Sequence, residues 1–270
     1  MLKLAQRSFT KSQTISKKLS IFQWNTLSDQ LAYNFPAVNP ELLKWEHRSP
    51  KLLKKIQEAS ADIMCLQEID HYYDFFKPQL ENLGYNGVYQ KKGAWHQDGC
   101  CIFFKNHYRK LEEYAIKYPG NQVAVGVLIE CENCPLYVFS THLKSKVGFD
   151  WLRKEQAEVL LNYIGNLKHY PVLVCGDFNS QPYSIPYKAM YENKIGLKSI
   201  FHDREPEFTT IKYRKALEKK TEDYIWIRGC QVVSTRPLPT EDIIGPTGLP
   251  TEDYPSDHLA LCALFYAESK

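Results

Sequence analysis

Several apolar segments of the sequence each present an acidic, amide or imidazole side chain at one end. These side chains are Asn25, Glu68, His142, Asp177 with Asn179, and Asp257 with His258. A single case is explained by the preference of Asp and Asn for turns, but the repetition favours one shared site. Carboxylate and amide oxygens are hard ligands, which Mg²⁺ prefers and which Mn²⁺ also accepts. The set therefore predicts a magnesium-dependent hydrolase of phosphate esters, because that reaction needs an activated water and cations that absorb phosphoryl charge.

The segments that carry these side chains have the length and composition of buried strands. Residues 61–68 (ADIMCLQE) form a near-continuous apolar run that ends in Glu68, and residues 136–142 and 171–179 repeat the pattern. Residues 150–167 carry apolar side chains at helical spacing, which indicates an amphipathic helix that covers a sheet. Because strands outnumber helices, we predict a four-layer α/β sandwich in which two mainly antiparallel sheets pack face to face with helices outside.

A helical region is expected over residues 42–59, with an interruption at Pro50. Ser49 can cap a second helical piece, and Pro50 can occupy its first turn. The region is thus predicted as two short helices.

Eight cysteines are present, and three of them, Cys65, Cys175 and Cys262, lie inside apolar strand-like runs. A reduced thiol serves there as a small buried hydrophobe, so we interpret the protein as intracellular and reduced. Cys131 and Cys134 have the spacing of half a zinc site, but tetrahedral zinc needs four ligands and no second pair at metal spacing accompanies them. A hairpin turn is the favoured interpretation of this segment.

The chain has 270 residues and a formal net charge of +3. This length suits one catalytic domain, which we place at residues 19–270, and we expect a monomer. The longest apolar stretch, residues 123–129, is too short to span a membrane. The mildly basic charge permits an anionic ligand but is well below that of proteins that hold long nucleic acid by charge alone.

Residues 1–18 form a basic tail that is rich in Ser and Thr and contains no acidic residue. This composition is typical of a mitochondrial transit peptide. The alternative is a disordered basic tail on a cytoplasmic protein.

Six motifs carry a family resemblance: WNTL, LQE, THLK, GDFNS, DYIW and SDH, in this order. With the matching segments between them, over residues 19–266, they resemble the deadenylase-like branch of the endonuclease/exonuclease/phosphatase superfamily, which has a DNase I-like fold. The resemblance implies that Glu68 is the main magnesium ligand and that Asn25 and Asp257 complete the metal and phosphate environment.

The same resemblance implies roles for the remaining polar residues. His258, oriented by Asp223, would act on the phosphoryl group as an acid, base or charge-stabilising histidine. Asp177 and Asn179 would position the attacking water, and His142 would hydrogen-bond the phosphoryl oxygens.

The resemblance also implies a substrate, NADP⁺ or NADPH, cleaved at the 2′-phosphate to give NAD⁺ or NADH and phosphate. The basic residues that match the substrate pocket of the family are Lys91, Lys144, Lys146 and Arg214. Cations near a metal site suit a substrate with several phosphates, since each cation offers charge-assisted hydrogen bonds. Lys146 replaces the arginine that is usual in the family, which removes bidentate geometry but keeps a point charge.

Two other functions stay open at this point. A poly(A)-specific 3′ exoribonuclease would stack RNA bases on aromatic residues such as Trp95, Tyr89 and Tyr213. The same residues can hold the rings of a dinucleotide, and the modest net charge favours this smaller ligand. A non-catalytic binding module would tolerate the loss of a site residue, whereas every motif is intact here.

Overall fold

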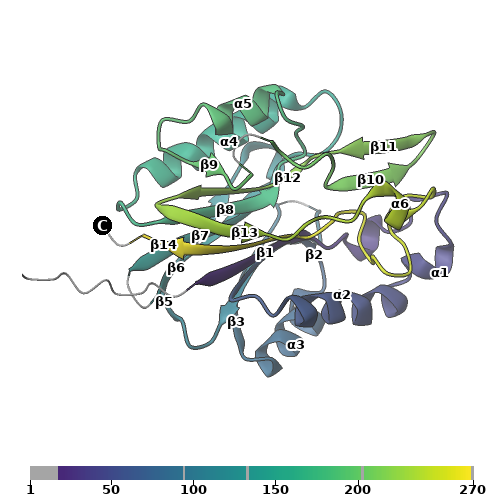
Figure 1. The fold of residues 1–270 in the computed structure, drawn as a ribbon, viewed down its shortest axis with the longest axis horizontal. Coiled ribbons are helices and arrows are strands. Elements are labelled where there is room, and N and C mark those ends of the chain that lie inside the picture. Colours follow the sequence, from purple (N-terminus) through teal and green to yellow (C-terminus); the bar gives the residue numbers. More distant parts are fainter. Residues whose placement is uncertain (1–17, 94, 132–133, 202–203, 269–270) are drawn as a thin grey trace, which may run out of the picture.

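The computed structural model describes residues 18–93, 95–131, 134–201 and 204–268. In this part of the chain, two six-stranded sheets pack face to face and helices cover their outer surfaces (Figure 1). The predicted α/β sandwich is therefore confirmed. Most of the predicted basic tail, residues 1–17, lies outside the described residues.

The two sheets have different strand orders. The first runs β13 (Cys230–Thr235), β14 (Leu261–Ala267), β1 (Leu19–Asn25), β2 (Ile63–Ile69), β4 (Gly99–Lys105) and β3 (Tyr85–Lys91). The second runs β5 (Arg109–Lys117), β6 (Val123–Glu130), β7 (Pro135–His142), β8 (Val172–Asp177), β12 (Asp223–Arg228) and β9 (Lys198–Ser199). Most neighbours are antiparallel, but β1 with β2 and β7 with β8 are parallel pairs, one in each sheet.

Helices flank both sheets. On the first sheet lie α2 (Trp45–Ala59) and α3 (Lys77–Asn82), and on the second lie α4 (Asp150–Gly165) and α5 (Ile185–Tyr191) (Figure 1). The small elements α1 (Pro40–Leu43), α6 (Glu241–Ile244) and the hairpin of β10 (Thr210–Tyr213) with β11 (Leu217–Lys220) lie at one end of the sandwich. Short 3₁₀ or π turns occupy Asp29–Leu31, Tyr72–Phe76 and Pro119–Asn121.

Burial on both faces explains the near-continuous apolar strands. In β2, Ile63 and Cys65 belong to the core between the sheets, whereas Met64 and Leu66 belong to the core beneath α2 and α3. Because side chains alternate between the two faces of a strand, a strand covered on both sides needs apolar residues at every position. The strand β8 shows the same division between the central core and the core beneath α4 and α5.

The parallel pairs bring the carboxyl ends of their strands to one edge of the sandwich. In β7 and β8, His142 lies opposite Asp177, and the antiparallel strand β12 places Asp223 opposite Asp177 on the other side. Gly176 permits this close pairing, because a Cβ atom at that position would lie 2.2 Å from the carbonyl oxygen of Thr141. The fold therefore gathers polar residues from distant segments at one edge.

A polar network lies in the otherwise apolar interior beneath this edge. Gln23 on β1 and Gln67 on β2 exchange two side-chain amide hydrogen bonds of 2.7 and 2.9 Å, and both residues are fully buried. Gln67 also donates to Ser140 Oγ on β7 at 3.0 Å. The network joins the two sheets directly and satisfies its buried polar atoms by mutual pairing.

The prediction of a helix break at Pro50 is wrong. The helix α2 runs continuously from Trp45 to Ala59 with Pro50 inside it, and the break between the two helical pieces lies at Lys44. Proline removes one intrahelical hydrogen bond, but the continuous helix buries Arg48 and Ser49 before Pro50 together with Leu52 and Ile56 after it. Tertiary packing therefore outweighs the local preference.

The favoured hairpin at the cysteine pair is confirmed. Strands β6 and β7 are antiparallel up to Glu130 and Pro135, and the amide of Cys131 donates to the carbonyl of Cys134 at 3.3 Å. Cys65 and Cys175 are fully buried, as expected, whereas Cys262 is partly exposed. Within the described ranges, no helix has both the length and the apolar character needed to cross a membrane.

Candidate active site

Asn25 links the two sheets at the polar edge. Its Nδ2 donates to Glu68 Oε1 at 3.1 Å and to Asp177 Oδ2 at 2.9 Å, while its Oδ1 accepts from the amide of Leu27 at 3.0 Å. Glu68 Oε2 also accepts from the amide of Ser28 at 3.0 Å. Two carboxylates from different sheets are thus held together by one buried amide.

The backbone of Glu68 has an unusual conformation. Its φ is +58°, and the pairing of β2 with β4 shifts register between Gln67 and Ile69. A bulge of this kind leaves the extra residue unpaired and redirects its side chain. A positive φ is unfavourable for a non-glycine residue, and such strain is frequent at functional sites.

The carboxylates form a group that can hold a cation. One ligand atom each from Glu68, His142 and Asp177 lies within 4.8 Å of the others. Burial and the nearby Asp257 raise the pKa of Glu68, and Asp257 Oδ1 is buried without a hydrogen-bond partner among the described residues. Crowded carboxylates with an unpaired oxygen are a donor set that suits Mg²⁺ or Mn²⁺.

This geometry agrees only in part with the ligands that the sequence predicts. Glu68 belongs to the cluster, and Asp257 lies beside it. Asn25 presents its amide nitrogen to the carboxylates, so its oxygen would face a cation only if the amide turned over. His142 and Asp177, which the sequence assigns to catalysis, join Glu68 in the cluster.

Asp223 and His258 form a buried pair. His258 Nδ1 donates to Asp223 Oδ2 at 2.8 Å, and the same oxygen accepts from Thr209 Oγ1 at 2.6 Å. Burial alone would lower the pKa of His258, but Asp223, with Asp257 and Asp177, outweighs burial and raises this pKa to about 10. His258 is therefore a cation at neutral pH, with Nε2 3.8 Å from Asp177 Oδ2. The sequence predicts this orientation by Asp223, but it gives Thr209 no role.

Asp177 is the carboxylate best suited to accept a proton. Burial raises its pKa to about 7, despite the opposing effects of His258 and of the hydrogen bond from Asn25. The amide of Asn179 donates to Asp177 Oδ1 at 2.8 Å, and Asn179 Nδ2 lies 3.0 Å from His142 Nε2. The predicted grouping of Asp177, Asn179 and His142 is thus present in the structure.

His142 is neutral. Burial, together with the charges of Lys92, His258 and Lys212, lowers its pKa well below the usual range. Lys92 Nζ lies 3.1 Å from His142 Nδ1, and an ammonium group can only donate. The amide nitrogen of Asn179 can also only donate and lies 3.0 Å from Nε2, so Lys92 and Asn179 compete for the one acceptor nitrogen of the neutral ring, whose Nε2 is 3.5 Å from Asp177 Oδ2.

Two lysines at the site, Lys92, which is buried, and Lys212, which is partly buried, escaped the sequence interpretation. Lys92 pairs with Asp98 and contacts His142, and Lys212 pairs with Asp257 at 2.5 Å and lies 3.3 Å from His258 Nε2. The sequence contains their signals, because Lys92 directly follows Lys91, and Lys212 lies two residues before Arg214. The positions at which β3 and β10 end determine which of two neighbouring basic side chains faces the site.

The basic residues that the sequence assigns to substrate binding lie farther out. Lys91 is exposed and donates to Gln97, and Arg214 is exposed in the turn of the β10–β11 hairpin. Lys144 is partly buried beneath the site edge, and Lys146 is exposed with φ +80°. They can therefore meet the outer part of a bound molecule, whereas Lys92 and Lys212 pair with carboxylates at the site.

The aromatic residues considered for base stacking differ in exposure. Trp95 is 94% exposed and Tyr213 is 39% exposed. Tyr89 is occupied, because its ring stacks on Tyr72 at 4.4 Å and its hydroxyl donates to the carbonyl of Ile69. Trp95 and Tyr213 are therefore accessible to a ligand, whereas Tyr89 is partly buried and its ring and hydroxyl already have partners.

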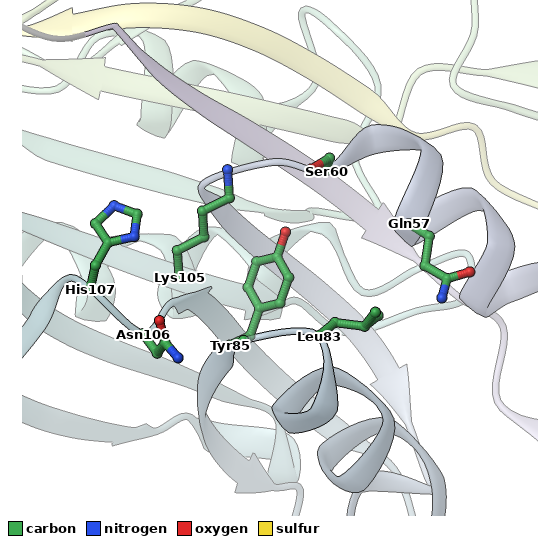
Figure 2. A pocket seen from close by; sticks show the side chains of 8 residues that line it. Gln57, Ser60, Leu83, Tyr85, Lys105, Asn106 and His107 are labelled. Carbon is green, nitrogen blue, oxygen red and sulfur yellow. The ribbon is translucent and has the colours of Figure 1, made fainter.

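A pocket of about 330 Å³ lies elsewhere on the surface (Figure 2). Its lining includes Tyr85, Lys105 and His107. Lys105 ends β4, whereas Asp98, which pairs with Lys92, directly precedes the start of the same strand. The length of β4, roughly 20 Å, therefore separates the pocket from the polar edge.

The chain is similar in sequence and in structure to proteins of one family. The Endonuclease/Exonuclease/phosphatase family model matches residues 22–258. Nocturnin of Mus musculus is 35% identical, with 96% of this chain and 69% of the relative aligned. The structure of the human Nocturnin catalytic domain with bound sulfate anion has 32% identity and a TM-score of 0.77, with 92% of this chain and 93% of that chain covered. The structure of ANGEL2, a 2′,3′-cyclic phosphatase, in complex with adenosine-2′,3′-vanadate has 25% identity and a TM-score of 0.83, with 94% and 97% covered.

Proposed function

This chain belongs to the Endonuclease/Exonuclease/phosphatase family, in its nocturnin-like branch, and from that premise we propose a Mg²⁺-dependent phosphatase that removes the 2′-phosphate of NADP⁺ and NADPH. The products would be NAD⁺ or NADH and inorganic phosphate. The observation that carries the proposal is the cluster of Glu68, His142 and Asp177 beside the ion-paired cations Lys92 and Lys212.

The reaction needs a proton acceptor for the attacking water. We assign this role to Asp177, because a base with a pKa near 7 is effective at neutral pH. The backbone amide of Asn179 and the side chain of Asn25 orient its two oxygens. When bound, Mg²⁺ supplies a Lewis acid that stabilises charge on the phosphoryl oxygens.

The histidines would contact the phosphoryl group beside Asp177, since His142 Nε2 and His258 Nε2 lie 3.5 and 3.8 Å from Asp177 Oδ2. Protonated His258, held by Asp223, can donate through Nε2 to an oxygen that gains negative charge. Neutral His142 can contact a phosphoryl oxygen without adding a charge. Water would attack phosphorus and pass its proton to Asp177, while the bond to the ribose 2′-oxygen would break and that oxygen would take a proton from another water molecule to leave as a hydroxyl group.

The relatives and the outer cations support this substrate class. The relatives include nocturnin and a 2′,3′-cyclic phosphatase crystallised with an adenosine-2′,3′-vanadate, whose name places chemistry at the 2′ position of an adenosine ribose. NADP(H) has such a position and also a pyrophosphate. Lys144, Lys146 and Arg214 are available for these additional phosphates, since none of them forms an ion pair with another described residue.

The proposal is tested by phosphate release from NADPH, NADP⁺ and an adenosine oligoribonucleotide, each with Mg²⁺ and with EDTA. We expect release from both dinucleotides, and none with EDTA. Nucleotide release from the oligoribonucleotide at a much higher kcat/KM would replace the proposal by the exoribonuclease alternative. Exposed Trp95 and Tyr213 are the features that favour this alternative.

A bell-shaped pH profile of kcat is expected for NADPH. Asp177 must be ionised to accept a proton, so the rate should rise as pH approaches about 7, and a bound cation moves this rise to lower pH. His258 must be protonated to stabilise charge, so the rate should fall as pH passes about 10. A kcat that stays constant from about pH 5 to about pH 11 would contradict both assignments.

Arg214→Lys is expected to raise KM for NADPH with little change in kcat. Lysine keeps the charge but removes the planar fork that suits two phosphate oxygens. The loss of one charge-assisted bond weakens binding by roughly 1–3 kcal/mol, which is about 5- to 150-fold in KM. Lys215→Met, in the same exposed turn, is the matched control. An unaltered KM would remove Arg214 from the substrate site.

We also propose that residues 1–18 direct the protein to mitochondria. Their basic, acid-free composition supports this destination. A fluorescent protein fused behind these residues should locate to mitochondria, and a variant with the basic residues replaced by Gln should not. A diffuse signal from the unaltered fusion would favour a cytoplasmic protein.

A further inference from the structure

Arg48 is a fully buried cation that the proposed chemistry does not use. It lies on α2 with 0% of its surface exposed. Its guanidinium group donates only to backbone carbonyls among the described residues: Leu43 at 3.2 Å, Thr26 at 3.2 Å, Leu27 at 2.9 Å and Pro255 at 3.2 Å. A buried arginine is normally paired with a carboxylate, so this arrangement requires a different explanation.

The first segment that Arg48 contacts, residues 25–28, supports the carboxylates of Glu68 and Asp177, which we call the carboxylate cluster. Residues 25–28 supply the amide of Ser28 to Glu68 and the side chain of Asn25 to both Glu68 and Asp177. Leu27 has φ +60°, a conformation that needs support from its surroundings. Arg48 provides this support at the carbonyl of Leu27 itself.

The second segment carries the other half of the site. Pro255 precedes Ser256, whose hydroxyl donates to the carbonyl of Asn25 at 2.6 Å and accepts from the amide of His258 at 3.1 Å. Asp257 lies between them. One guanidinium group therefore joins two segments that are more than 200 residues apart in sequence and that together carry the proposed metal and phosphoryl contacts.

We propose that Arg48 is a positioning residue that fixes residues 25–28 against residues 255–258 and so sets the affinity of the carboxylate cluster for a divalent cation. This inference rests on the proposed function, because that function places the cation at Glu68. The guanidinium group is essential to it, because Nη1 donates to both segments while Nε is anchored on the carbonyl of Leu43, and an ammonium group has no second nitrogen for this anchor. The charge of Arg48 alone would act in the opposite direction, because a nearby cation repels a bound dication.

Arg153 offers a matched comparison within the same chain. It is 5% exposed, lies on α4, pairs with Asp150 and donates to the carbonyls of Lys144 and Lys146 at 2.8 Å each. Arg153 therefore holds the segment of Lys144 and Lys146, which the proposed function assigns to substrate binding. Arg48 instead holds the segments beside the proposed cation site. Loss of each arginine should affect a different measurement.

The experiment measures Mn²⁺ binding by electron paramagnetic resonance, with KM for NADPH as the second readout. Arg48→Lys and Arg48→Met are expected to weaken Mn²⁺ binding by about 10- to 100-fold, the usual effect of removing a residue that orients metal ligands. Arg153→Met should raise KM and leave the dissociation constant of Mn²⁺ within about twofold. Far-ultraviolet circular dichroism identifies folded variants, and Arg48→Lys decides the result if Arg48→Met does not fold.

The outcomes separate this inference from the proposed function. If the wild-type protein neither binds Mn²⁺ nor is activated by it, the proposed function fails. If the wild type binds Mn²⁺ but folded Arg48→Lys binds it equally well or more tightly, only the role of Arg48 is overturned. Equal weakening by Arg153→Met would also overturn it, because a general loss of stability would then explain both effects.

Discussion

Replacement of Glu68 by Gln is expected to reduce kcat with Mg²⁺ by about a thousandfold or more while the protein stays folded. Glutamine keeps an oxygen that can accept from Ser28 and fills the same space, but it removes the charge that attracts a cation. A metal contributes several kcal/mol of transition-state stabilisation, and each 1.36 kcal/mol is about tenfold in rate. Turnover of NADPH and Mg²⁺ binding by calorimetry would be measured together.

Glu81→Gln is a suitable control for this substitution. Glu81 lies on the outer helix α3 and forms a surface ion pair with Lys77. Its loss should leave both turnover and Mg²⁺ binding unchanged, since exposed pairs contribute little. Near-wild-type turnover of Glu68→Gln would show that the cluster around Glu68 is not the catalytic centre.

The second large effect is expected from Asp223→Asn and His258→Gln, each of which should lower kcat by roughly 10²- to 10⁴-fold with a smaller change in KM. Asp223 keeps His258 protonated and oriented, so both single variants lose the same charged donor. The double variant should therefore be little slower than either single variant, because residues that act as a unit are not additive.

Steady-state kinetics of the three variants test this pair, with the exposed His107→Gln as a control remote from the site. Multiplicative losses in the double variant would show that Asp223 and His258 act independently. Asp223 would then need a function other than holding the imidazolium.

The sequence was sufficient to predict the sandwich, because strands buried on both faces have a composition that few other elements share. It also predicted the polar strand ends that meet at the site, since the parallel pairs of β1 with β2 and of β7 with β8 bring them to one edge. Asn25, Glu68, His142 and Asp177 are close together for this reason.

The residues that the sequence did not reveal act through three-dimensional neighbours. Lys92 and Lys91 are adjacent and chemically identical, and only the end of β3 decides which one is buried beside His142. Thr209 acts by donating to the side chain of Asp223, and Arg48 acts by donating to backbone carbonyls. Neither contact can be predicted from the residue types in the sequence. Tyr89 shows the converse, because an aromatic residue that suggests base stacking is used instead to pack against Tyr72.

The position of β1 between β14 and β2 has a consequence for biosynthesis. On the ribosome, β1 is made early and can pair with β2 soon afterwards, but its other edge stays open until residues 261–267 have been synthesised. An open strand edge is a template for association with other chains. Contacts between segments that are far apart in the sequence, such as β1 and β14, form slowly. Nascent chains that stop before residue 257 would therefore expose this edge and also lack Asp257 and His258, so a product terminated there would be both inactive and prone to aggregation.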